Sequence, residues 1–224
     1  MMSAVAPAVA VCACDNCGVD STIVRYCPDH HRYWRGATKL TSVSRIIREC
    51  WPIRKNFEDA PADVLEHARE RGHRIDKYFS EYLRHGRGRM PAGEWIEVRV
   101  GVLALVDWWK SEGIGAAQAQ VTVANASEAG TADAIAGHVV LELKCVSALE
   151  PTYDLQVGAY ADLEGTGALR EGVLLHCKID ATAGRARVRA VPVALRQAVD
   201  DWRCLRDVWR IAERRNPKKV QEAE

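Results

Sequence analysis

The spacing of hydrophobic and polar residues divides the chain into helical and extended segments. Within residues 94 to 112, Val98, Val102, Leu105 and Trp109 recur three or four positions apart, which predicts an amphipathic helix with one buried stripe. Similar periodicity and capping residues predict helices at 42 to 50, 61 to 84 and 194 to 214, and a helix carrying Gln156. Strands are expected at 171 to 179 and 186 to 193.

The helix expected at 194 to 214 separates apolar from basic positions. Its core-facing residues are predicted to be Val199, Trp202, Leu205, Val208 and Trp209. Its outward-facing residues are predicted to be Arg203, Arg206, Arg210 and Arg214. These arginines would either line a groove for nucleic acid or be solvated.

A β-hairpin is predicted where Gly137-His138 separates two apolar-rich runs, 131 to 136 and 139 to 146. A two-residue connection with glycine first is typical of a type II′ turn, which fixes the register of the strands. If residue 136 pairs with 139, then 135 pairs with 140 and Asp133 lies opposite Glu142. Lys144 shares their face because side chains alternate along a strand.

Two carboxylates that face each other on a sheet need a cation nearby. Directly opposed residues have Cβ atoms about 4.5 to 5.5 Å apart, where like charges destabilise the sheet. Lys144 is one partner for Asp133 and Glu142, and a bridging divalent cation such as Mg²⁺ is a better one, since it also keeps waters for a phosphate substrate. Leu141, Leu143 and Cys145 would face the buried side. The alternative is a surface hairpin with an ordinary Glu-Lys ion pair.

Three motifs in order, Gly130-x-x-Asp133, Glu142-x-Lys144 and Gln156-x-x-x-Tyr160, resemble the PD-(D/E)XK nuclease superfamily, and more narrowly its RecB-like exonuclease branch. The resemblance covers residues 41 to 180. It implies an α/β fold with a restriction-endonuclease-like core, in which helices flank a small mixed sheet. It further implies a DNA exonuclease that uses Mg²⁺ or Mn²⁺ to hydrolyse phosphodiester bonds at single-stranded or duplex ends, in replication, recombination or repair, including that of bacteriophages.

The same resemblance implies a role for each motif residue. Asp133 and Glu142 would hold one or two ions, with the Leu143 carbonyl as a further ligand. Lys144 would orient the attacking water and offset negative charge in the transition state. Gln156 and Tyr160 lie four residues apart on one helical face and would support the site, although Tyr160 is also explained by ordinary helix packing.

A third metal ligand is less clearly specified by the sequence. The family pattern Arg-Gly-Thr-x-x-His is matched in part by Arg71-Gly72, with His73 in the Thr position and Asp76 in the His position. Both side chains would share a helical face, and Asp76 is slightly favoured over His73 because a carboxylate is the harder ligand. A solvated charged face is the alternative. The strand before Asp133 offers only Gln118 and Gln120, so no ligand is assigned there.

A second cluster of ligand-type residues lies near the amino terminus. Cys14-x-x-Cys17 and Cys27-x-x-His30 form two knuckles with the spacing of a tetrahedral, structural Zn²⁺ site. The alternative is a set of free thiols. The other cysteines occur singly, which suggests a reducing cytoplasm. The expected organisation is a Cys/His zinc-knuckle-like module at 1 to 38, a nuclease domain at 39 to 215 and a charged tail at 216 to 224.

The formal net charge of +1 does not itself indicate nucleic-acid binding, but the basic residues are unevenly distributed. Residues 25 to 55 contain eight Lys or Arg and interleaved aromatics, a composition typical of single-strand binding. The predicted DNA contacts are Arg32, Arg35, Arg45 and Arg71, with a bland basic surface as the alternative. No apolar run is long enough to span a bilayer, so no membrane association is expected.

Two other functions fit the same residues. A restriction-like or structure-specific endonuclease would use the same Asp133, Glu142 and Lys144, and would also cut circular DNA. A non-catalytic DNA-binding or recombination-partner protein would retain the fold with a weakened metal site, a reading favoured by the missing His at 76 and the missing acid near 120. The expected protein partner is a single-strand-annealing or recombination protein.

Overall fold

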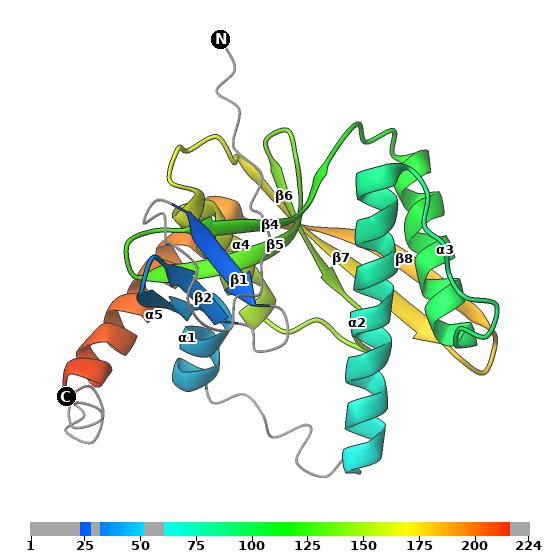
Figure 1. Cartoon of the computed structure of the whole chain (residues 1–224), viewed down its shortest axis with the longest axis horizontal. Helices are drawn as coiled ribbons and strands as arrows, with labels where there is room; N and C mark the ends of the chain where they lie inside the picture. The colour runs from blue at the N-terminus through cyan, green and yellow to red at the C-terminus, as the bar shows by residue number, and fades with distance from the viewer. Residues whose placement is uncertain (1–22, 28–31, 52–60, 216–224) are drawn as a thin grey trace.

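The structure is a computed structural model that describes residues 23 to 27, 32 to 51 and 61 to 215 (Figure 1). The helices are α1 (Val43–Cys50), α2 (Ala62–His85), α3 (Ile96–Ser111), α4 (Thr152–Glu164) and α5 (Leu195–Arg215). The strands are β1 (Val24–Cys27), β2 (Arg32–Arg35), β3 (Thr38–Ser42), β4 (Gln118–Ala124), β5 (Glu128–Ala136), β6 (Val139–Lys144), β7 (Glu171–Asp180) and β8 (Arg185–Val193).

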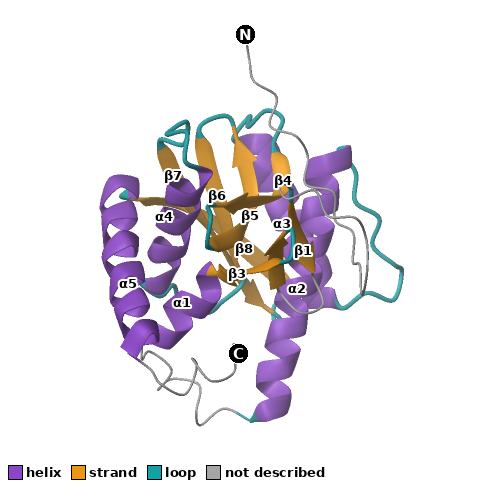
Figure 2. Cartoon of the chain, turned by 60° about the vertical axis from the view of Figure 1, so that its left-hand side comes forward, coloured by secondary structure: helices purple, strands orange, loops and turns teal. Residues whose placement is uncertain are grey.

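A mixed sheet lies between two groups of helices (Figure 2). One core packs α2 and α3 against one face of the sheet, and the other packs α1, α4 and α5 against the opposite face. The neighbours run in the order β1-β2-β3-β5-β6-β7-β8, and β4 pairs with β5. This arrangement agrees with the predicted α/β core of a mixed sheet flanked by helices.

Strand β5 organises the sheet because it has different neighbours along its two edges. Near its start, Ala129 pairs with Ala124 of β4 on one edge and with Ser42 of β3 on the other. Near its end, Ala134 pairs with β4 on the first edge and with β6 on the second. Strands β3 and β6 therefore occupy the two ends of the same edge, and the stretch between these pairings contains Asp133.

The hairpin has the predicted register. Residue 136 pairs with 139, 135 with 140 and 134 with 141. Gly137 has φ of 58° and His138 does not have a positive φ, as a type II′ turn requires. Leu141 and Leu143 pack with α2 and α3, while Val140 belongs to the opposite core, so the side chains alternate as expected.

The four helices with predicted bounds, α1, α2, α3 and α5, begin and end within two residues of them. The Ser42 hydroxyl accepts a hydrogen bond from the Arg45 backbone N–H at 3.2 Å and caps α1. Gly86 follows α2 with φ of 67°, the left-handed conformation that glycine adopts without steric cost, and its N–H donates to the Tyr82 carbonyl at 2.8 Å. Local capping chemistry therefore sets the ends of these helices.

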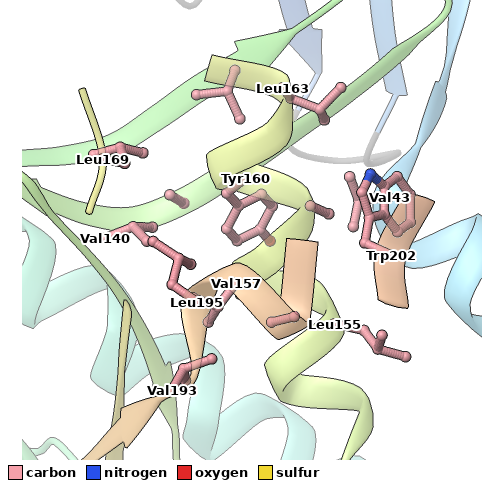
Figure 3. Close-up of a cluster of buried hydrophobic side chains, with 14 of the residues drawn as sticks. Val43, Val140, Leu155, Val157, Tyr160, Leu163, Leu169, Val193, Leu195 and Trp202 are labelled. Atoms are coloured by element: carbon pink, nitrogen blue, oxygen red, sulfur yellow. The ribbon is translucent and has the colours of Figure 1, made fainter. Parts of the chain in front are cut away.

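The core around α4 and α5 is built on Tyr160 and Trp202, both almost completely buried (Figure 3). In Figure 3 the Tyr160 ring lies among aliphatic side chains from the sheet and the helices. The prediction that Val208 faces this core is wrong, because its side chain is 61% exposed. Trp209, the next residue, packs against this core and Val208 does not, so Val208 lies outside the buried stripe of α5.

Strands β1, β2 and β3 were not expected from the sequence. They form an antiparallel meander that joins the main sheet through two parallel pairs between β3 and β5. The predicted boundary between residues 38 and 39 falls inside β3, while residues 1 to 22 and the tail from 216 lie outside the described residues. Among the helices that the structure describes, none has the length and apolar character needed to cross a membrane.

Candidate active site

A cavity of about 680 Å³ opens where β3 and β6 separate along β5. Its walls come from segments far apart in the sequence. The predicted site residues that line it are His73, Asp76, Asp133, Glu142, Leu143, Lys144, Gln156 and Tyr160. Other lining residues include Tyr26, Tyr33, Lys77, Arg84 and Gln120. The structure therefore brings every predicted catalytic residue, and both candidates for the third metal ligand, to one cavity.

Four carboxylates line this cavity, those of Asp76, Glu81, Asp133 and Glu142. Asp133 is fixed by the Leu143 backbone N–H, which donates to Oδ2 at 2.8 Å, so the hairpin itself orients the side chain. Glu142 lies on the neighbouring strand with only 3% of its surface exposed. Burial, together with the charge of Asp133, raises the pKa of Glu142 to about 8. Burial also raises the pKa of Asp76 to about 8, again with a contribution from Asp133.

One oxygen of Glu142 is left without a partner. Oε1 accepts a hydrogen bond from Lys144, but Oε2 is buried and has no hydrogen-bond partner among the described residues. A buried, ionised carboxylate oxygen without a donor or a cation is costly. At this position the protein therefore requires either a proton or a positively charged ligand.

Lys144 is held by a chain of polar side chains that reaches into α4. Its Nζ donates to Glu142 Oε1 at 2.7 Å and to Gln156 Oε1 at 2.9 Å. The Gln156 amide donates in turn to the Tyr160 hydroxyl at 2.6 Å. Burial alone would lower the pKa of Lys144, but Glu142 and Asp133 outweigh it and the net shift is upward. Lys144 is therefore a fixed cation beside the two carboxylates.

Gly130 makes room for Tyr160. A Cβ at position 130 would lie 2.6 Å from Tyr160 Cε1, so any other residue would displace the ring. On the far side of the opening, Tyr33 stacks on Tyr26 with 4.8 Å between ring centroids, and its hydroxyl bonds Thr131 Oγ1 at 2.9 Å. The β1 to β3 meander thus supplies one wall of the cavity.

Gln120 is a site residue that sequence reasoning missed. Its Nε2 donates to Asp76 Oδ1 at 3.0 Å and Oδ2 at 3.1 Å, and also reaches Asp133 Oδ1 at 3.3 Å. Its backbone has φ of 55°, in the left-handed region, which costs a non-glycine residue about 1 to 2 kcal/mol. The sequence did point to this strand, because the family pattern often has an acidic metal ligand there and Gln120 is one of the two glutamines found instead.

The four predicted DNA-contacting arginines do not line the cavity. Arg45 is paired with Glu49 at 2.8 Å, and Arg71 has a buried Nε without a hydrogen-bond partner among the described residues. Arg32 and Arg35 lie on β2. Lys77 and Arg84 of α2 are exposed and do line the cavity, and the sequence analysis did not name them as DNA contacts.

Arginines of α5 are paired within the protein. Arg203 and Arg206 each bond Asp162 of α4 at 2.7 Å. Arg210 is bonded to Glu128, a glutamate with only 1% of its surface exposed. These three arginines therefore tie α5 to the rest of the fold instead of forming an open basic surface.

Asp133, Glu142 and the Leu143 carbonyl provide the oxygen chemistry that a hard divalent cation prefers. The partnerless Glu142 Oε2 fits such a cation, because a metal would satisfy an oxygen that is otherwise orphaned. Within residues 23 to 27, 32 to 51 and 61 to 215, no three His, Cys, Asp or Glu side chains are close enough to form a metal site by themselves. Gln120 lies between Asp76 and Asp133 and keeps those two carboxylates apart.

The predicted zinc ligands fall mostly outside the described residues. Cys14, Cys17 and His30 are among the residues that are not described, and Cys27 is buried at the end of β1. The zinc site therefore stays a prediction.

No protein-family model and no curated protein matches this chain. The chain is similar to solved structures of low sequence identity. A suggested exonuclease from Eubacterium rectale is 15% identical over 73% of this chain and 77% of that one, with a TM-score of 0.49. A phage-related exonuclease from Haemophilus somnus 129PT is 10% identical over 83% and 96%, with a TM-score of 0.43. An alkaline exonuclease from Laribacter hongkongensis is 11% identical over 83% and 95%, with a TM-score of 0.37.

Proposed function

We propose that the chain is a divalent-metal-dependent deoxyribonuclease that hydrolyses phosphodiester bonds at DNA ends. The observation that carries the proposal is the group formed by Asp133, Glu142 and Lys144 in one cavity, with Glu142 Oε2 buried and lacking a partner. Folding alone gives no reason to bury two neighbouring carboxylates whose negative charges repel each other. A cation that binds both would offset that cost.

Asp133, Glu142 and the Leu143 carbonyl would hold Mg²⁺ or Mn²⁺, and Asp76 and His73, which the sequence predicted as alternatives for a third ligand, line the same cavity. Bound there, the ion would lower the pKa of a water and polarise a phosphoryl oxygen. Lys144 faces the same space and would hold the attacking water and offset the negative charge that develops on the phosphate. Its two hydrogen bonds to Glu142 and Gln156 fix the ammonium group before substrate binds.

The outer part of the cavity suits a nucleic-acid strand. Lys77 and Arg84 provide exposed cations for backbone phosphates at one wall. Tyr26, half-buried at another wall and backed by the buried Tyr33, provides an aromatic ring, and aromatic rings stack on unpaired bases. The proposed substrate is therefore a DNA end whose terminal nucleotides can leave the duplex.

The biological setting that we propose is DNA replication, recombination or repair, with phage replication as one instance. A single-strand-annealing or recombination protein is the proposed partner. Structural zinc bound by Cys14, Cys17, Cys27 and His30 is part of the same proposal, and elemental analysis of the purified chain tests it.

The decisive experiment uses DNA labelled at its 5′ or 3′ end, as single-stranded, duplex and circular substrates, with Mg²⁺, Mn²⁺ or EDTA. We expect metal-dependent shortening of linear DNA, and its loss in Lys144→Ala. Lys178→Ala is the matched control, because Lys178 is an exposed lysine on the adjacent strand β7 and should retain full activity.

Each other outcome identifies a different function. Cleavage of circles would replace the exonuclease with an endonuclease. DNA binding without any cleavage in either metal would refute catalysis and favour a binding module.

A further inference from the structure

The backbone of Gln120 has a conformation that is unusual for a residue in a strand. It lies in the middle of β4, yet its φ of 55° is in the region that side-chain-bearing residues rarely adopt. The flanking residues Ala119 and Val121 pair with β5 in one continuous register, so the distortion affects a single position. Such isolated strain persists only where the surrounding structure holds it, and it is often associated with function.

The strained backbone of Gln120 is accompanied by a set of hydrogen bonds from its side chain to both carboxylates. Its Nε2 lies 3.0 and 3.1 Å from the two oxygens of Asp76, 3.3 Å from Ser80 Oγ and 3.3 Å from Asp133 Oδ1. Ser80 also donates to Asp76 Oδ1 at 3.3 Å. The amide therefore connects α2, which carries Asp76, to β5, which carries Asp133. The amide occupies the position in which a single bound group can contact both Asp76 and Asp133.

An amide nitrogen in that position excludes a metal ion. The NH₂ group has two donor hydrogens and no electron pair that a hard cation accepts, so it satisfies the carboxylates without being a ligand. A cation shared by Asp76 and Asp133 would have to displace this NH₂ group, either by moving the Gln120 side chain or by turning its amide so that Oε1 faces the ion. Between Asp133 and Glu142 the situation differs, because Glu142 Oε2 is buried and has no partner among the described residues.

We propose that Gln120 is a positioning residue that keeps Asp76 out of the metal centre, so that the cavity binds one divalent cation, at Asp133 and Glu142, instead of two. This inference rests on the proposed metal-dependent function. Asp76 then acts through Gln120, by holding the amide that in turn orients Asp133. The departure from an acidic residue at position 120 thereby sets the number of ions.

The test counts bound Mn²⁺ by titration without DNA, following free Mn²⁺ by electron paramagnetic resonance in protein whose zinc content has been measured. We expect one Mn²⁺ per wild-type chain in the cavity, and none after Asp133→Asn. Gln120→Glu replaces the neutral donor by a third ligand-type carboxylate, and should bind two ions with the spin-coupled signal of a neighbouring pair.

Gln118→Glu is the matched control. Gln118 lies two residues earlier on the same strand, is exposed and does not line the cavity, so this variant should still bind one ion. Gln120→Gly gives a second measurement that does not depend on the folding of Gln120→Glu. Glycine accepts the positive φ and frees Asp76, so this variant should also bind two ions.

The outcomes separate the two proposals. Two ions in the wild-type chain, or one ion in both Gln120→Glu and Gln120→Gly, would overturn the role of Gln120 and leave the metal-dependent function intact. No ion in the wild-type chain would refute the metal-dependent function itself. The expected number of bound Mn²⁺ ions is one for the wild type and for Gln118→Glu. It is two for Gln120→Glu and for Gln120→Gly.

Discussion

Replacing Glu142 by Gln should stabilise the metal-free protein at high pH while abolishing its activity. Glutamine has nearly the shape of a protonated glutamate and still offers an Oε1 acceptor to Lys144. The substitution therefore removes a buried negative charge with little change in packing. Active sites commonly carry such destabilising charges, because their function requires them.

The pKa of Glu142 gives the sign and the size of the effect. Its pKa rises from an ordinary 4.5 to about 8, so the folded state holds the proton more tightly than the unfolded state. The corresponding stability is fully present below pH 4.5 and is lost as the pH rises to about 8. At about 1.4 kcal/mol per pH unit the loss has an upper bound of about 5 kcal/mol.

Asp133 and Asp76 contribute to the same shift, so we expect about half of that bound, roughly 2 to 3 kcal/mol at pH 9. For a domain of this size the gain corresponds to a rise in Tm of roughly 5 to 10 °C. At pH 5 the wild type and Glu142→Gln should melt at nearly the same temperature, because Glu142 is then protonated.

The assay is thermal unfolding in EDTA at pH 5, 7 and 9, repeated with Mg²⁺. Mg²⁺ should stabilise the wild type and reduce or reverse the advantage of the variant, because the cation binds the ionised carboxylates. Glu112→Gln, at an exposed glutamate after α3, is the control and should show no pH-dependent difference. A difference in Tm that is constant across pH, or a variant that is less stable at pH 9, would refute the reasoning.

Three further substitutions and one calorimetric measurement have defined expectations. Lys144→Met should lower DNA cleavage by about 10² to 10³-fold, with an unchanged circular dichroism spectrum, since one preorganised charge is worth that much. Gly158→Ala should destabilise by about 1 to 3 kcal/mol or more in urea unfolding, because the new Cβ would lie 2.3 Å from a backbone oxygen of α5. Arg210→Met should cost about 1.5 to 3 kcal/mol in the same assay, because the buried Glu128 loses its cation and, among the described side chains, keeps only the hydrogen bond from the Asn125 amide. Calorimetry at pH 7 in buffers of different ionisation enthalpy should detect proton release on Mg²⁺ binding, because Glu142 with a pKa of about 8 must ionise to become a ligand.

Local rules explain why the centre of the site was predictable. The type II′ turn fixed the register of the hairpin, and side-chain alternation then placed Asp133, Glu142 and Lys144 on one face. Helical spacing placed Gln156 and Tyr160 together in the same way, and a hydrogen bond joins them. These predictions used residues close in sequence, for which secondary structure determines relative position.

The features that were missed depend on long-range contacts or on unusual chemistry. The pairing of α5 arginines with Asp162 and Glu128 joins residues more than 40 positions apart. Helical periodicity predicted only that the arginines face outward, either along a nucleic-acid groove or into solvent, and could not predict these partners. Gln120 was passed over because a neutral amide is a poor ligand, and its role depends on donating hydrogen bonds instead. The short strands β1 to β3 contain few consecutive apolar residues, and the neighbouring Cys/His pattern gave a different interpretation.

The contact of α5 with Glu128 has a consequence for how the protein is made. Trp202 and Arg210 are synthesised near the end of the described chain, yet one fills the core and the other neutralises a glutamate buried at the start of β5. A nascent chain that lacks α5 would leave Glu128 uncompensated and the α4 face of the sheet uncovered. The sheet should therefore complete its folding only after α5 emerges from the ribosome, and the cavity, with its facing carboxylates, would be the last part of the protein to form.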